Sequence, residues 1–277
     1  MLDNLINWYY PESLEEALSL LKKNEVIPHA GGTTILRAGN KRIRGLADLG
    51  RLPLKSLSED KQYYYIGSCA TFHQSATWGA LTGPATIIRQ AAGMAASTQL
   101  RNRITIGGSI AAPPVWSDLP PVLLALDAEI ETIGTVKGWF PARQFFRKSP
   151  LDGTSLITMV RVPKLAGQAV FERVTRTRFD YSLLDLACYM SIIDGTIDKM
   201  RIAIGCAVAK TVRLTEVEDM LIGEKPSEEL FNETIEKLTF QPLKDRRISK
   251  SYKIALLKIL LKRSLNQLPN FNSISRL

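Results

Sequence analysis

The chain has 277 residues, enough for two domains, and its 45% hydrophobic and 23% charged content excludes a disordered protein. No run approaches the roughly 18 uninterrupted apolar residues of a membrane-spanning helix. The opening segment lacks the pattern of a secretory signal, so we expect a cytoplasmic protein. The formal charge of +9 would suit an acidic partner or nucleic acid.

The first predicted element is a helix after Pro11, which Ser13 can cap, with Glu16 at the capping-box position. The segment VIPHAGGTTIL predicts a short strand, a glycine turn and a continuation. The alanine-rich segment from Pro84 to Ala96 predicts a helix. Further strands are predicted in GLADL, YYYIGSC, ITIGGSI, EIETIG and SLITMVRV. This mixture indicates α+β layers without a regular βαβ repeat.

The pattern changes after Pro163. Two strand-like segments, LLDLACYMSII and TIDKMRIAIGCAV, flank Asp194-Gly195, which is a strong two-residue hairpin signal. Three helices follow. The first begins at a predicted capping box formed by Thr215 and Glu218 and ends at Gly223. The other two run from Ser227 to Leu238 and from Ser251 to Leu265. We therefore expect a boundary near residues 165–175 and, after it, a hairpin-based sheet with helices packed on it.

The cysteines and histidines limit the metal chemistry of the chain. Cys69, Cys188 and Cys206 are odd in number and far apart, which favours a reduced setting. No pair has the C-x-x-C spacing, and His29 and His73 are the only histidines. The chain alone therefore offers no four-cysteine iron–sulfur or zinc site, and sites rich in imidazole are nearly excluded.

Positive charge is concentrated in two stretches, Arg37 to Lys61 and residues 237–263. The second stretch contains nine Lys or Arg residues and one acid, Asp245. It is either a docking surface for an acidic partner or nucleic acid, or a solvated helix face, which is the commoner meaning of such a run. No aromatic interleaving or nucleic-acid motif accompanies the charge.

Two glycine pairs share a context. Gly31-Gly32 and Gly107-Gly108 each follow strand-forming or small residues, and each precedes a hydroxyl side chain. Glycine permits positive φ and lets backbone N–H groups approach a ligand, and successive free N–H groups form a concave anion site. Two such turns facing each other could hold both halves of a pyrophosphate.

The same glycines have a structural interpretation. A glycine pair after a strand is more often a hairpin turn or a bulge, and neither the Rossmann fingerprint nor a P-loop is present. The small residues leading to Asp118 suit a pocket for a flat ring and ribose hydroxyls, or a tight connection into a helix that begins near Leu119. The residues alone leave both interpretations open.

A family resemblance adds to this pattern. Six segments occur in a characteristic order: HAGGTTIL, LADLGRL, YIGSCATF, ASTQLRNRITIGGS, APPVWSDLPPVLLALDA and FERVTRTRFD. Together they closely resemble the FAD-binding medium subunit of the molybdenum hydroxylases, the group of xanthine dehydrogenase and aerobic carbon monoxide dehydrogenase. The resemblance extends from WYYPESLEEAL to DRRIS, almost the whole chain.

The resemblance implies an α+β flavin fold of the vanillyl-alcohol oxidase type, followed by a small C-terminal domain of antiparallel sheet and helices. It implies three parts: an N-terminal FAD-binding subdomain at 1–55, a second FAD-binding subdomain at 56–168 and a C-terminal flavoprotein domain at 169–277. The fold is shared with the enolpyruvyl-sugar reductase of wall synthesis.

Matching the motifs residue by residue implies a cofactor site. One side of the pyrophosphate would be bound by Ala30, Gly31, Gly32, Thr33 and Thr34, and the other by Thr105, Ile106, Gly107, Gly108 and Ser109. Asp118 would contact a ribose or nearby hydroxyl, Ile157 would contact the isoalloxazine ring, and Arg173 is the candidate basic residue near the flavin. The family usually has Asn where Ser109 stands, and Asp or Ser where Thr34 stands.

The family activity is an electron relay. A large subunit with a molybdenum–pterin cofactor hydroxylates the substrate, and a small subunit with [2Fe–2S] clusters passes electrons to the FAD of the medium subunit. That subunit then reduces NAD⁺ or another acceptor. The chemistry requires no side-chain acid, base or nucleophile in this chain. Tyr181 and Cys188 are accordingly interpreted as a core tyrosine and a buried structural cysteine.

Three hypotheses follow. The chain is the flavin subunit of a hetero-oligomeric molybdenum hydroxylase, a stand-alone flavoprotein reductase or oxidase on the same fold, or a basic interaction protein that binds nucleic acid and no flavin. A flavin absorption band would eliminate the third. Co-purification with large and small subunits would separate the first two.

Overall fold

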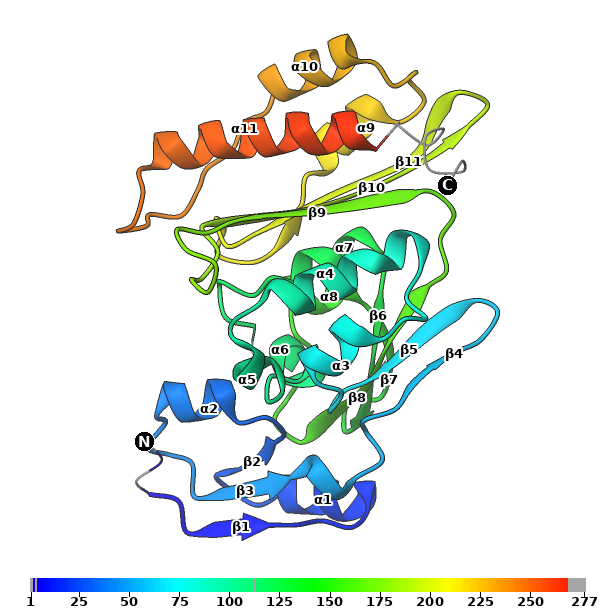
Figure 1. The fold of residues 1–277 in the computed structure, drawn as a ribbon. Helices are drawn as coiled ribbons and strands as arrows, with labels where there is room; N and C mark the ends of the chain where they lie inside the picture. The colour runs from blue at the N-terminus through cyan, green and yellow to red at the C-terminus, as the bar shows by residue number, and fades with distance from the viewer. Residues whose placement is uncertain (1, 3, 112, 269–277) are drawn as a thin grey trace.

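The computed structural model describes residues 2, 4–111 and 113–268. Three sheets succeed one another along the molecule, with the N-terminal sheet at one end and the C-terminal sheet and its long helix at the other (Figure 1). Residues 269–277 of the predicted C-terminal domain lie outside the described part. No described helix combines the length and apolar character needed to cross a membrane.

The N-terminal sheet is parallel, with the order β1-β3-β2. Its strands are β1 (Asn7–Tyr9), β2 (Val26–His29) and β3 (Gly45–Asp48), connected through helices α1 (Leu14–Leu21) and α2 (Thr33–Ala38). The Ser13 hydroxyl accepts a hydrogen bond from the Glu16 N–H, as the capping signal predicts. The β-α-β-α-β order departs from the expectation of no such repeat, and the second half of VIPHAGGTTIL is helical rather than extended.

The middle layer contains a five-stranded sheet in the order β4-β5-β8-β6-β7, in which all neighbours are antiparallel. Its strands are β4 (Leu57–Glu59), β5 (Tyr63–Gly67), β6 (Glu129–Gly134), β7 (Gly138–Pro141) and β8 (Ser155–Pro163). Its helices are α3 (Phe72–Thr77), α4 (Thr86–Met94), α5 (Thr98–Arg101), α6 (Ile106–Ala111), α7 (Leu119–Ala125) and α8 (Ala142–Arg147), with a 3₁₀ turn at Gly83–Ala85. A second 3₁₀ turn, Leu49–Arg51, follows β3 and packs against the N-terminal sheet. The main core lies between this sheet and these helices.

The predicted strand ITIGGSI is wrong, because α6 begins at Ile106. Ile106 and Ile110 are one helical turn apart and both are buried in the main core. Their spacing lets one face of a short helix fill the core, and this packing overrides the strand preference of the β-branched residues.

The C-terminal sheet is antiparallel, in the order β12-β11-β10-β9. Its strands are β9 (Gln168–Val174), β10 (Leu184–Ile193), β11 (Thr196–Gly205) and β12 (Val212–Arg213), and its helices are α9 (Thr215–Leu221), α10 (Glu228–Glu236) and α11 (Lys250–Gln267). Helix α11 packs on β9 and β10, whereas α4 and α7 contact the sheet from the middle layer (Figure 1). The predicted hairpin at Asp194-Gly195 is confirmed, since both residues have positive φ.

Two sequence signals in this region have different outcomes. The predicted capping box at Thr215 is wrong, because Glu218 instead accepts a hydrogen bond from the Ile202 N–H and pairs with Arg213. In the basic stretch 237–263, several charges are neutralised by neighbouring acids, for example by Asp245, which pairs with Arg247 and Lys253.

Candidate functional site

A cavity of about 650 Å³ is lined chiefly by the segment joining β2 to α2, by parts of residues 95–111 and 114–118, and by strands β8 and β9 with the loop after β9. This volume is in the range of about 300–1,000 Å³ typical of cofactor sites. Every residue of the predicted site except Ile106 lines it, namely Ala30, Gly31, Gly32, Thr33, Thr34, Thr105, Gly107, Gly108, Ser109, Asp118, Ile157 and Arg173.

The first glycine pair presents free backbone donors to the cavity. Gly32 has a φ of +74° and occupies the N-cap position of α2 without a side-chain cap. Within the described part of the chain, the N–H groups from Gly31 to Ile35 have no hydrogen-bond acceptor. A left-handed residue followed by successive free N–H groups is the arrangement that binds anions.

The second glycine pair differs, because its N–H groups are already bonded to other parts of the protein. The Gly107 N–H donates to the Ser68 carbonyl at 2.7 Å, and the Gly108 N–H donates to the Thr105 hydroxyl at 3.2 Å. The Ile106 N–H donates to the Ala70 carbonyl, and its side chain is buried in the core. The expectation of free N–H groups here is therefore wrong, and Ile106 does not line the cavity. Thr105 and Ser109, which carry hydroxyl side chains, still line the cavity.

The two glycine segments are in direct backbone contact. A Cβ atom added to Gly31 would lie 1.7 Å from the carbonyl oxygen of Arg103, just before the second segment. One added to Gly107 would lie 2.6 Å from the Cβ of Ser68. Neither position accepts a side chain without movement of its neighbours. Glycine at position 31 is what lets the two segments approach each other, and glycine at position 107 lets the second segment approach Ser68.

Asp118 and Arg173 form a buried ion pair in the cavity wall. Asp118 occupies the N-cap position of α7, and Arg173 is on β9, with 3.1 Å between the Asp118 Oδ2 and the Arg173 Nη1. Arg173 also donates to the carbonyls of Met94 and Asp180, and its buried Nε has no partner in the described structure. Burial raises the pKa of Asp118, and the Arg173 charge opposes this effect.

A stacked group from three segments also lines the cavity. The Arg37 guanidinium lies 4.3 Å from the ring centre of Trp116 and 4.9 Å from that of Tyr181. Tyr181 is 46% exposed, so its interpretation as a core tyrosine is wrong, whereas Cys188 is fully buried as predicted. Sequence reasoning missed this group because its members are up to 144 positions apart and carry no common motif.

Comparison with known families identifies the chain. Residues 4–165 match the FAD binding domain in molybdopterin dehydrogenase, and residues 169–268 match the CO dehydrogenase flavoprotein C-terminal domain. The chain belongs to this family of FAD-binding subunits. It is the flavoprotein component of an oxidoreductase of the molybdenum hydroxylase type, and its cofactor is FAD.

Individual relatives agree with this assignment. The glyceraldehyde dehydrogenase medium chain of Sulfolobus acidocaldarius is 29% identical over 90% of this chain and 93% of its own length. The nicotine 6-hydroxylase medium subunit of Paenarthrobacter nicotinovorans is 31% identical over 81% and 82%. A solved carbon monoxide dehydrogenase from Hydrogenophaga pseudoflava is 25% identical, with a TM-score of 0.90, and the match covers 97% of this chain and 98% of that one. The predicted fold class is confirmed.

The residues present fit FAD. The free N–H groups from Gly31 to Ile35 suit phosphate oxygens, and Leu156 and Ile157 provide an apolar wall suited to a flat ring. The unpartnered Nε of Arg173 leaves a buried donor available to an acceptor on the cofactor.

Proposed function

We propose that the chain binds the diphosphate of FAD between its two glycine segments, with the isoalloxazine ring beside Ile157. The observation that carries this proposal is the backbone contact between Gly31 and Arg103, which brings both segments to one cavity. We also propose the division into parts at 1–55, 56–168 and 169–277. The family matches at 4–165 and 169–268 support the boundary before residue 169. The change from the parallel sheet, which ends with β3, to the five-stranded sheet, which begins with β4, supports the boundary after residue 55.

Within this site, the two sides have different tasks. The N–H groups that follow Ala30 donate to one side of the diphosphate, and the hydroxyls of Thr105 and Ser109 donate to the other. The side chains of Thr33 and Thr34 are secondary, since the backbone supplies the donors there. Asp118 has lone pairs left to accept from a ribose hydroxyl, because a carboxylate has about four acceptor positions.

We infer that the subunit works in an electron relay. Bound flavin can take up electrons singly and release them in pairs. The electrons would come from the [2Fe–2S] clusters of a small subunit, in a complex with a large subunit that carries molybdenum–pterin, and would leave to NAD⁺ or another acceptor. The names of the relatives, medium chain and medium subunit, support a multi-subunit complex. This chain contributes binding, orientation and a cavity that limits contact with water.

A visible spectrum tests the flavin site. We expect the purified chain to show the absorption of oxidised flavin, or to gain it in a one-to-one ratio when FAD is added. A preparation that stays colourless after incubation with FAD contradicts the proposal. Affinity capture of the tagged chain from its native host then tests the relay. Recovery of molybdenum and iron–sulfur subunits supports it, and a flavin-bearing chain recovered alone favours a stand-alone reductase or oxidase.

A further inference from the structure

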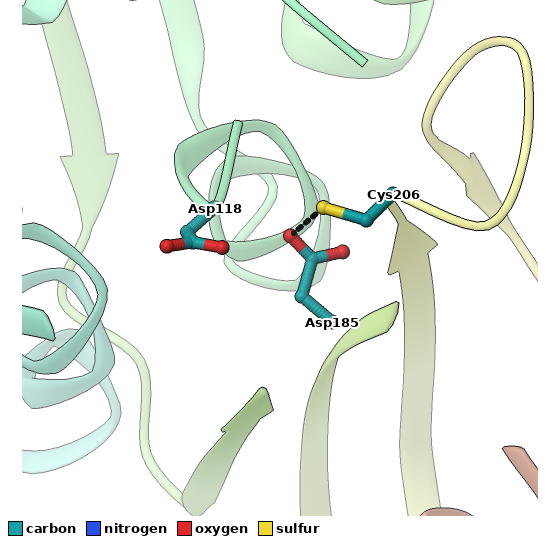
Figure 2. Close-up of side chains that lie close together, drawn as sticks. All are labelled: Asp118, Asp185 and Cys206. Atoms are coloured by element: carbon teal, nitrogen blue, oxygen red, sulfur yellow. Dashed lines mark hydrogen bonds between the residues drawn. The ribbon is translucent and has the colours of Figure 1, made fainter. Parts of the chain in front are cut away.

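A group of buried side chains lies directly behind the cavity wall. It consists of Asp118 before α7, Asp185 on β10 and Cys206 just after β11 (Figure 2). One carboxylate oxygen of each aspartate and the Cys206 Sγ all lie within 4.8 Å of one another. The Cys206 thiol donates a hydrogen bond to the Asp185 Oδ2 at 3.1 Å. Figure 2 shows the Asp185 carboxyl between the other two side chains.

The charges of this group do not balance if both carboxyl groups are ionised. Asp185 is fully buried, and Asp118 is 5% exposed. The one cation in contact is Arg173, which pairs with Asp118, and no described cation pairs with Asp185. Arg247 faces the group from the segment before α11, but it is bound to Asp245 and to backbone carbonyls. Two ionised carboxylates would therefore leave one buried negative charge without a partner, which is strongly destabilising.

One shared proton removes this imbalance, and the contacts indicate where it lies. Asp118 faces Arg173 and accepts from the Ser182 hydroxyl at 2.6 Å, which favours its ionised form. Asp185 faces no described cation, accepts from the weakly donating Cys206 thiol, and has an Oδ1 atom without a hydrogen-bond partner in the described structure. Burial and the nearby Asp118 charge raise the pKa of Asp185 well above its usual value, and burial and the Asp185 charge raise that of Cys206. A proton on Asp185 would let this residue donate a hydrogen bond to the neighbouring Asp118 carboxylate while it accepts one from the Cys206 thiol.

The backbone is shaped around this carboxyl group. A Cβ atom added to Gly205 would lie 2.4 Å from the Asp185 Oδ1, and Cys206 has a φ of +60°. A residue other than glycine rarely adopts this left-handed backbone conformation, and it does so only where surrounding contacts hold it in place. The turn that ends β11 thus directs the thiol at Asp185.

We propose that Asp185 is a positioning residue of the flavin site: it retains its proton and donates a hydrogen bond to the Asp118 carboxylate. This hydrogen bond holds Asp118 in the orientation that places Arg173 on the cavity wall. The inference rests on the proposed role of this cavity in binding FAD. It assigns the C-terminal sheet a part in that site, since Asp185 and Arg173 are on β10 and β9, whereas Asp118 precedes α7.

Two substitutions test whether Asp185 acts as a hydrogen-bond donor or as a buried anion. In Asp185→Asn, the amide can donate to Asp118 and accept from Cys206, so we expect a dissociation constant for FAD within about threefold of the original chain. In Asp185→Ala, Asp118 loses its donor, and we expect FAD to bind about tenfold more weakly or worse. Flavin fluorescence quenching measures both constants. Equal losses in the two variants would overturn the proposal, since an anion at Asp185 is absent from both.

Infrared spectroscopy of the chain without FAD gives an independent reading. The spectrum of the original chain minus that of Asp185→Asn should contain a protonated carboxylic-acid band at neutral pH. Loss of carboxylate bands instead would contradict the proposal. This result does not require FAD to bind, so failure of the flavin site and failure of the proton assignment are distinguishable.

Stability as a function of pH supplies a third reading. The pKa of Asp185 is higher in the folded chain than its ordinary value of 3.8, which applies to the unfolded chain. The contribution of this residue to the free energy of unfolding is therefore complete below about pH 3.8 and is lost as the pH rises towards the folded pKa. In that interval the unfolding constant of the original chain should rise relative to that of Asp185→Asn, by at most about tenfold per pH unit. A constant ratio between the two chains across the interval would show that Asp185 keeps its ordinary titration.

Discussion

The two glycine pairs look alike in sequence and have different physical roles in the structure. Gly31-Gly32 precedes α2 and leaves a row of N–H groups free. Gly107-Gly108 lies within α6, where the same groups are bonded to Ser68 and Thr105. The first pair therefore supplies free donors together with a close backbone contact at Gly31, whereas the second pair supplies close packing without free donors. A glycine pair beside a hydroxyl does not by itself identify an anion site, because the neighbouring carbonyls decide whether its N–H groups are available.

The largest effect is expected from Gly31→Ala. The added methyl would overlap the Arg103 carbonyl, so the two segments must separate. Overpacking of this kind costs about 1–3 kcal/mol. Where this whole cost is taken from the free energy of FAD binding, FAD should bind about tenfold to hundredfold more weakly. Titration of the purified variant with FAD, followed by fluorescence, measures the change.

Gly79→Ala is the matched control for that variant. Gly79 has no neighbouring atom within 4 Å of the added Cβ and has no left-handed φ. We expect unchanged FAD binding and a thermal midpoint equal to that of the original chain or slightly higher. If both substitutions weakened binding equally, contact between the two segments would not explain the effect.

Gly108→Ala should have an intermediate effect. Its added Cβ would lie 2.8 Å from the Thr105 hydroxyl, an atom on a side chain that can rotate, rather than from backbone. We expect binding about threefold to tenfold weaker, because the rotation costs one hydrogen bond. A loss as large as that of Gly31→Ala would break the distinction between the two segments.

The smallest effects are expected from removing one hydroxyl group on each side of the proposed diphosphate site. Ser109→Ala removes a proposed donor on the second side and should weaken FAD binding about twofold to tenfold. Thr34→Ala leaves the backbone donors of the first side in place, so we expect a change of less than about twofold. Isothermal titration of both variants under one buffer condition tests this order, and the reverse order would refute the division of roles.

Local signals predicted many of the elements. Asp194-Gly195 marks its hairpin because a two-residue turn of this type requires positive φ at both positions. Ser13 caps its helix through a hydroxyl three residues from the amide it satisfies. The failures occur where packing competes with local preference, as at Ile106, whose β-branched side chain predicts a strand and is buried on a helix.

The candidate site was predicted in position but not in detail. The glycine pairs, Asp118 and Arg173 follow from motifs and line one cavity. The stacking of Arg37 on Trp116 and Tyr181 does not, because no short motif records a contact between distant segments.

By itself, the sequence determined the family, the cofactor and the glycine pairs that line the site. These properties depend on residue type and local spacing. Only the tertiary structure decided which N–H groups remain free, and that the Asp118 ion pair lies against a second carboxyl group, Asp185. The reason is that hydrogen-bond satisfaction and the protonation of buried acids depend on atoms from remote parts of the chain, which folding alone places in contact.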